Sequence, residues 1–151
     1  MNMKYFFNES EVLDTEDSSF ALGWFTINNI DFFKSTYCIL TVSLVDLISN
    51  LIILKSRKKN KIVWYPSDSG EKVELIKFKN SIELIYNNNK ILLDFINFEN
   101  EVYEVSKNLL NELYRNYNKV EIESAFKDLF ICIKNNKDFS YKPDSSDMFN
   151  V

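Results

Sequence analysis

The chain has 151 residues, a net charge of −4 at neutral pH and 46% hydrophobic side chains, which suits one folded domain and excludes disorder throughout. It contains no histidine and only two glycines. Without histidine, the chain lacks the usual general acid or base near neutral pH and the commonest metal ligand. The scarcity of glycine disfavours glycine-rich phosphate-binding loops.

Residues 1–18 are polar and acidic and show no periodicity, so we expect an irregular N-terminal arm. Residues 1–31 carry six acidic side chains and one basic side chain, whereas the remaining residues carry 16 acidic and 17 basic ones. This asymmetry argues against nucleic-acid binding and favours either solvation or a basic partner protein. We predict that the arm and the aromatic strand after it form a partner-binding surface, with these candidate residues: Glu9, Glu11, Asp14, Glu16, Asp17 and Trp24. The alternative is that the aromatic side chains belong to the core and the acids only face water.

Two strands and a helix are predicted next. Residues 19–27 are apolar and aromatic, which is typical of a buried strand, and Gly23 is the position for a bulge. After the turn signal Asn28-Asn29, residues 37–42 are predicted to form the antiparallel partner strand. Residues 43–55 are predicted to form a helix, with Ser43 and Asp46 as its capping box.

The apolar segment at residues 37–54 has the length of a membrane span, and basic residues follow it. However, Asp46 falls at its centre, where an ionised side chain costs about 2.5–3.5 kcal/mol. Asp46, Ser49 and Asn50 would also form a polar stripe on a helix. We therefore predict a strand and a helix of a soluble domain, without membrane contact.

Four short strands are predicted at residues 61–65, 72–79, 81–86 and 90–97, and the short turns between them enforce antiparallel hairpins. Helical periodicity follows at residues 102–117 and 122–133, with Asn118 and Glu121 as the cap of the second helix. The prediction is an α+β domain at residues 19–134, with an antiparallel sheet of about six strands, one helix after the first two strands and two C-terminal helices. The helices are expected to cover one face of the sheet, and residues 135–151 to form an irregular polar tail.

Few residues could carry catalysis. Residues 66–77 contain Asp68, Glu71, Glu74 and Lys77, which could hold Mg²⁺ for phosphodiester cleavage, although a hairpin turn with solvated charges explains them as well. Cys38 and Cys132 lie among apolar residues, so we expect buried thiols in a reducing, cytoplasmic setting. We predict no catalytic residue, no metal site and no cofactor.

A basic cluster follows the first predicted helix and consists of Lys55, Arg57, Lys58, Lys59 and Lys61. These side chains could contact phosphate or an acidic protein, or they could complement the C-terminal end of the helix dipole. Aromatic residues do not interleave with them, as a nucleic-acid stacking platform requires, so a helix-end loop is the favoured interpretation.

The abundance of Asn, Lys, Ile, Phe and Tyr indicates an AT-rich coding sequence. The order of the segments SSFALGW, TVSLVDLISNLIIL, WYPSDSGEKVELI, SIELIY and ILLDF, followed by helices, resembles that in the immunity proteins of bacterial polymorphic-toxin and contact-dependent inhibition systems. Over residues 19–134, this resemblance implies a cytoplasmic, non-catalytic protein that binds and neutralises one cognate toxin, often a basic nuclease. The alternatives are a structural or regulatory subunit that self-associates through a sheet edge, and a metal-dependent phosphodiesterase that uses residues 66–77.

Overall fold

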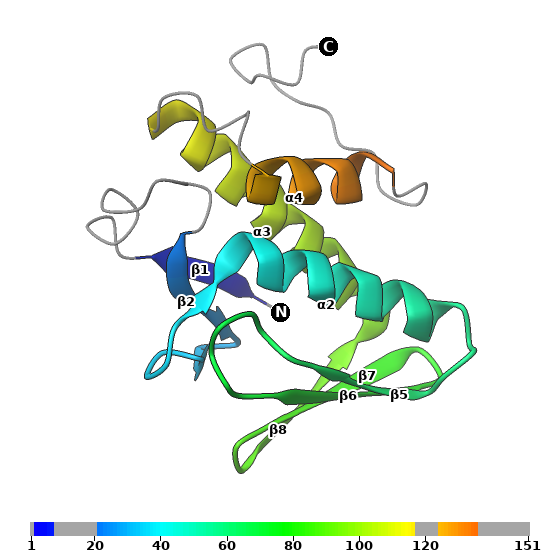
Figure 1. The fold of residues 1–151 in the computed structure, drawn as a ribbon. Helices are drawn as coiled ribbons and strands as arrows, with labels where there is room; N and C mark the ends of the chain where they lie inside the picture. Colours follow the sequence, from blue (N-terminus) through cyan, green and yellow to red (C-terminus); the bar gives the residue numbers. More distant parts are fainter. Residues whose placement is uncertain (1, 8–20, 117–123, 136–151) are drawn as a thin grey trace.

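The computed structural model describes residues 2–7, 21–116 and 124–135 (Figure 1). These residues form an α+β arrangement, as the sequence predicts. In chain order the elements are β1 (Met3–Phe7), β2 (Leu22–Ile27), β3 (Ile30–Phe32), β4 (Cys38–Ile39), α2 (Leu40–Lys55), β5 (Lys61–Trp64), β6 (Val73–Phe78), β7 (Ser81–Tyr86), β8 (Asn89–Asp94), α3 (Phe95–Asn116) and α4 (Ser124–Lys134).

The described strands form two antiparallel sheets of four strands each, so the predicted single sheet of about six strands is wrong. In the first sheet β2 is central, with β1 on one edge and β3 and β4 one after the other on the opposite edge. The second sheet is the meander β5-β6-β7-β8, which confirms the predicted hairpins. Figure 1 shows the three helices on one side of this second sheet. Alternation identifies strands but not which of them share a sheet, so periodicity could not predict the division.

The first sheet corrects two further predictions. Residues 3–7, expected to lie in the irregular arm, form β1 and pair with β2 in register from Met3↔Ile27 to Phe7↔Gly23. Residues 37–42 contribute only the two-residue strand β4, and the longer partner on that edge of β2 is β3. The predicted turn at Asn28-Asn29 is present with φ values of 50° and 67°, and it is so tight that pairing resumes at Ile30.

Gly23 lies in regular strand pairing rather than at the predicted bulge. It pairs with Phe7 on one edge of β2 and with Cys38 on the other. A Cβ atom at this position would lie 1.9 Å from the carbonyl oxygen of Phe6. The position requires glycine because β1 passes too close for a side chain.

Helix α2 begins at Leu40 rather than at Ser43, and its N-cap residue Ile39 makes no side-chain capping hydrogen bond. The predicted capping box is therefore wrong. Ser43 is buried instead, and its hydroxyl accepts a hydrogen bond from the backbone N–H of Ser67 at 2.9 Å. A tertiary contact thus uses the side chain that local sequence assigns to a cap.

The outer side of α2 carries the predicted polar stripe. Asp46 and Ser49 are exposed and Asn50 is half-buried, whereas the opposite side of the helix contributes six fully or nearly fully buried apolar residues: Leu40, Leu44, Leu47, Ile48, Leu51 and Leu54. In the part of the chain that the structure describes, no helix is both long enough and apolar enough to cross a membrane.

Helix α3 begins at Phe95, because the Asp94 carboxylate accepts a hydrogen bond from the backbone N–H of Asn97 at 3.0 Å and caps the helix. The last predicted strand therefore ends at Asp94. The predicted apolar helix faces are confirmed by the buried residues Val102, Val105, Leu109 and Leu113 of α3 and Ala125, Phe126, Leu129 and Ile133 of α4. The predicted cap at Asn118 and Glu121 lies outside the described residues, as does most of the tail.

An aromatic cluster joins the two sheets; we use this name for Phe25, Phe32, Phe33, Trp64 and Tyr86. The ring centroid of Phe33 lies 5.2 Å from those of both Trp64 and Tyr86. The Trp64 indole N–H donates to the carbonyl oxygen of Ser43 at 3.0 Å, and the Tyr86 hydroxyl accepts from the backbone N–H of Phe33 at 3.1 Å. Because these polar atoms are paired, the rings are buried without an unmet hydrogen bond.

Substitution of Gly23 tests the close approach of β1. Gly23→Ala is expected to lower the free energy of unfolding by more than about 2 kcal/mol, because the new methyl group forces β1 away from β2. Urea denaturation followed by circular dichroism measures the change. Gly70→Asn is the control, because Gly70 has φ +75° with open space around it, and asparagine tolerates this backbone region. Equal losses in the two variants would contradict the steric role of Gly23.

Candidate partner-binding surface

Three aromatic side chains form a row on the outer face of the first sheet. We call Phe6, Trp24 and Tyr37 the aromatic ladder. The ring of Trp24 stacks between those of Phe6 and Tyr37, at centroid distances of 5.2 Å and 5.7 Å. Side chains alternate between the two faces of a strand, so Trp24 points outward while its neighbour Phe25 is buried in the aromatic cluster.

The aromatic ladder is partly open to solvent. Phe6 is 39% exposed, and Trp24 and Tyr37 are half-buried. The Nζ atom of Lys34 lies 5.7 Å from the ring centroid of Trp24 and 3.7 Å from the Asp31 carboxylate. The indole nitrogen of Trp24 is buried and has no hydrogen-bond partner among the described residues. The ladder therefore presents a partly exposed aromatic area, whereas the indole nitrogen itself is closed to solvent.

A strained loop places Tyr37 in the ladder. The φ angles of Phe33 and Tyr37 are 69° and 60°, in the left-handed region that side chains other than glycine seldom adopt. The backbone N–H of Tyr37 donates to the carbonyl oxygen of Phe33 at 2.8 Å and closes the loop. Because the ring of Phe33 is held in the aromatic cluster, the same loop fixes one ring inside the core and another outside it.

Of the predicted site residues, the structure places only Trp24. The five acidic residues Glu9, Glu11, Asp14, Glu16 and Asp17 lie outside the described residues, between the end of β1 and the start of β2 in sequence. Sequence reasoning missed Phe6 and Tyr37. The apolar run from Tyr5 to Phe7 is too short to show a strand period, and Tyr37 gave no signal because its position depends on the loop.

The candidate magnesium-binding residues, Asp68, Glu71, Glu74 and Lys77, have separate surroundings. Glu71 accepts a hydrogen bond from the Tyr86 hydroxyl, and burial followed by this contact raises the pKa of Tyr86. Glu74 pairs with Lys61 at 3.6 Å. Across the described ranges, no group of three or more aspartate, glutamate or cysteine side chains could hold a metal ion.

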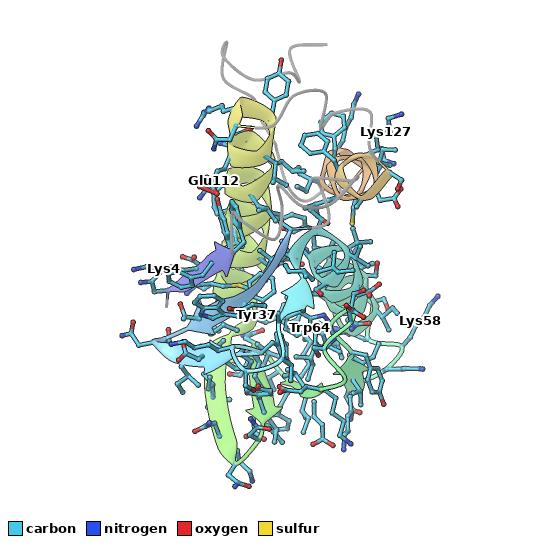
Figure 2. All side chains as sticks on the ribbon, turned by 60° about the vertical axis from the view of Figure 1, so that its left-hand side comes forward. Lys4, Tyr37, Lys58, Trp64, Glu112 and Lys127 are labelled. Carbon is cyan, nitrogen blue, oxygen red and sulfur yellow. The ribbon has the colours of Figure 1, made fainter. Side chains whose placement is uncertain are left out.

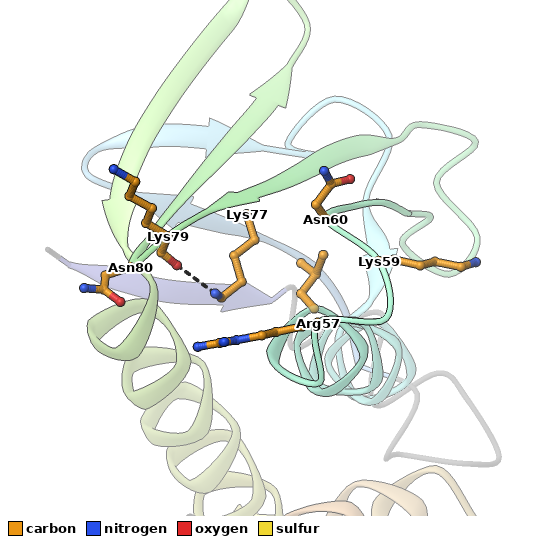
Figure 3. Close-up of a pocket in the computed structure, with 7 residues that line it drawn as sticks. Arg57, Lys59, Asn60, Lys77, Lys79 and Asn80 are labelled. Carbon is orange, nitrogen blue, oxygen red and sulfur yellow. Dashed lines mark hydrogen bonds between the residues drawn. The ribbon is translucent and has the colours of Figure 1, made fainter.

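Two parts of the predicted basic cluster have different surroundings. Lys55 forms an ion pair with the buried Glu99 at 3.1 Å, which links the end of α2 to the start of α3. Arg57 and Lys59 instead line a pocket of about 420 Å³, together with Lys77 and Lys79 from the β6–β7 region (Figure 3). The sequence did not reveal this pocket, because the pairing of β5 with β6 brings its two sides together.

A second cavity, of about 470 Å³, lies between β1 and α3. It lies on the side of the molecule where Figure 2 shows Lys4 and Glu112, away from Lys58. The Tyr5 hydroxyl donates a hydrogen bond to the Glu112 carboxylate at 2.9 Å. Burial, followed by the effect of Glu112, raises the pKa of Tyr5, so the hydroxyl stays protonated and holds β1 against α3.

Both cysteines are free thiols. Cys38 is fully buried, and burial raises its pKa to about 12. Burial also raises the pKa of the half-buried Cys132. Because thiolates are the reactive species, neither cysteine is activated as a nucleophile near neutral pH.

Comparisons of the chain with protein-family models, curated proteins and solved structures found no match. The resemblance to toxin immunity proteins therefore stays a hypothesis.

Trp24 and Phe25 provide a paired test, because these neighbours point to opposite faces of β2. Phe25→Ala should lower the free energy of unfolding by about 3–5 kcal/mol, since it empties a fully buried site. Trp24→Ala should cost less than about 2 kcal/mol, since the ring is partly exposed. Urea denaturation measures both, and equal losses would favour the alternative that Trp24 belongs to the core.

Proposed function

We propose that the protein is a non-catalytic protein-binding module, and specifically an immunity protein that binds and neutralises a cognate toxin domain in the cytoplasm. The observation that supports this proposal most is the aromatic ladder, whose three stacked rings are partly open to solvent. Tryptophan and tyrosine in partly exposed positions are the residue types that most often dominate binding energy at interfaces. In the sequence, the five acidic residues of the arm lie between β1, which carries Phe6, and β2, which carries Trp24.

Neutralisation of a toxin by occlusion needs no chemistry from the inhibitor. The negative charge of the arm would raise the rate of encounter with a basic partner, and the ladder would slow dissociation once its rings are desolvated. Phe6, Trp24 and Tyr37 already stack on one another, so little side-chain freedom is lost on binding.

If a toxin domain is encoded immediately upstream, as this proposal expects, binding kinetics with that domain test the proposal. Trp24→Ala is expected to weaken binding by about 2 kcal/mol or more, roughly a 30-fold change in Kd, mainly through faster dissociation. Replacement of the five arm acids by their amides is expected to lower the association rate at low salt about tenfold and to flatten its salt dependence. Surface plasmon resonance separates the two rates, and co-expression measures protection of the cell.

A matched control replaces five acidic residues elsewhere on the described surface by their amides: Asp46, Asp68, Glu83, Glu104 and Asp128. This control has the same net charge as the arm variant, so it should associate faster than that variant if the position of the charge matters. An unchanged association rate in the arm variant would exclude the arm as a docking surface. An unchanged dissociation rate for Trp24→Ala would exclude the aromatic ladder.

A self-associating subunit is the second candidate, and strand β8 supports it. β8 is an edge strand of the second sheet, and its outward residues Lys90, Leu92 and Asp94 are exposed. If two copies of β8 pair antiparallel about Leu92, Lys90 of each copy faces Asp94 of the other. Exposed strand edges with such complementarity are templates for pairing.

Sedimentation equilibrium tests this second candidate, which predicts a dimer. Leu92→Lys should abolish the dimer by placing two like charges at the centre of the paired strands. Phe78→Lys is the control, because Phe78 is 70% exposed, close to the 69% of Leu92, but lies on the interior strand β6. A wild-type chain that stays monomeric at all concentrations would exclude self-association without affecting the toxin-binding proposal.

A further inference from the structure

The pocket at the end of α2 has a strongly basic lining. We call it the basic pocket, and its lining residues are Leu54, Arg57, Lys59, Asn60, Lys77, Lys79 and Asn80. Four of these side chains are cationic, two are carboxamides and none is acidic, although the chain has a net charge of −4. Among the described residues, the four cations form no ion pair, in contrast to Lys34, Lys55 and Lys61.

The backbone holds the two sides of the basic pocket together. The N–H of Lys77 donates to the carbonyl oxygen of Asn60 at 2.8 Å, which extends the pairing of β5 with β6 into the pocket wall. The Nζ atom of Lys77 donates to the carbonyl oxygen of Lys79 at 2.7 Å and lies 5.2 Å from the ring centroid of Phe95. An ammonium group has three donors, so Lys77 is positioned by one and keeps two for a ligand.

The charged groups differ in direction, as Figure 3 shows. The guanidinium of Arg57 and the Nζ atom of Lys77 lie on the same side of the pocket as Asn80. The Nζ atoms of Lys59 and Lys79 point away from them. Arg57 and Lys77 are therefore the two candidate donors to one anion, and Lys59 and Lys79 would contribute only longer-range attraction.

Arg57 occupies a backbone position that suits glycine better. It follows the C-cap residue Ser56 of α2 with φ 65°, and its N–H donates to the carbonyl oxygen of Leu54 at 3.2 Å. Helices commonly end with glycine at this place, because a Cβ atom is unfavourable in the left-handed region. Seven other described residues that are not glycine also have positive φ, Lys79 of the same pocket among them, so the conformation does not itself mark a function but makes Arg57→Gly a mild substitution.

We propose that the basic pocket binds a phosphate group, either free or carried by a small ligand of nucleotide size. Arg57 and Lys77 would donate to the phosphate oxygens, with the Asn80 carboxamide beside them, because a guanidinium fork and an ammonium are the usual phosphate donors. The volume of about 420 Å³ is within the range of small-molecule sites. The site shares no residue with the aromatic ladder and stands independently of the toxin-binding proposal.

An NMR titration of the full chain tests the site with three probes: inorganic phosphate, ADP and adenosine. We expect shifts centred on the Arg57 side chain and the Asn80 amide with phosphate and ADP, and none with adenosine, which lacks phosphate. Tighter binding of ADP would identify a nucleotide-like ligand, and equal binding would identify free phosphate. Absence of binding up to about 10 mM, or equal binding of adenosine, would overturn the proposal.

Two variants distinguish a specific phosphate site from non-specific electrostatic attraction of phosphate. Arg57→Gly is expected to weaken phosphate binding about tenfold or more without lowering the Tm, since glycine suits the backbone there. Lys59→Gln removes the same charge from a side chain that points away, and it should weaken binding by less than about threefold. Equal weakening in the two variants would show non-specific electrostatic attraction and would overturn the site.

Discussion

The hydrogen bond from the Trp64 indole N–H to the carbonyl oxygen of Ser43 ties the second sheet to α2 within the aromatic cluster. Both residues are fully buried, where an unmade hydrogen bond costs about 1–3 kcal/mol. The Ser43 hydroxyl also accepts the backbone N–H of Ser67, so one residue of α2 holds both β5 and the loop after it. The rings of Phe25 in β2 and of Phe33 in the loop after β3 pack against Trp64, and this packing joins the first sheet to the second.

Both candidate surfaces are extensions of this core. The loop that buries Phe33 beside Trp64 also turns Tyr37 outward, where it completes the aromatic ladder on the first sheet. At the other end of α2, the chain leaves the helix through Arg57 and enters β5, whose pairing with β6 brings Lys77 into the basic pocket. The core thus positions a partly exposed aromatic surface and a cationic pocket that have no residue in common.

The sequence predicted residues of the candidate surface only where a local pattern of residue types pointed to them. Trp24 could be proposed from the aromatic strand, but not its exposure, because the face of β2 that it occupies depends on what packs against Phe25. The sequence could not place Tyr37 beside Trp24, or Arg57 in one pocket with Lys77, because a loop and strand pairing bring together residues that are distant in sequence. Conversely, Glu71 and Glu74 are close in sequence, yet each has a different partner in the fold.

The sequence by itself determined the α+β class, the meander of the second sheet and the buried sides of the helices. These features follow from periodicity and turn residues, which act over a few neighbouring positions. Only the tertiary structure decided the division into two sheets, the start of α2 and the pairing of β1. In these places one group has more than one possible partner. The Ser43 hydroxyl, for example, could cap α2 but instead accepts the Ser67 N–H. The packing of the whole core selects the partner, and at Gly23 the backbone of β1, which is distant in sequence, leaves no room for a side chain.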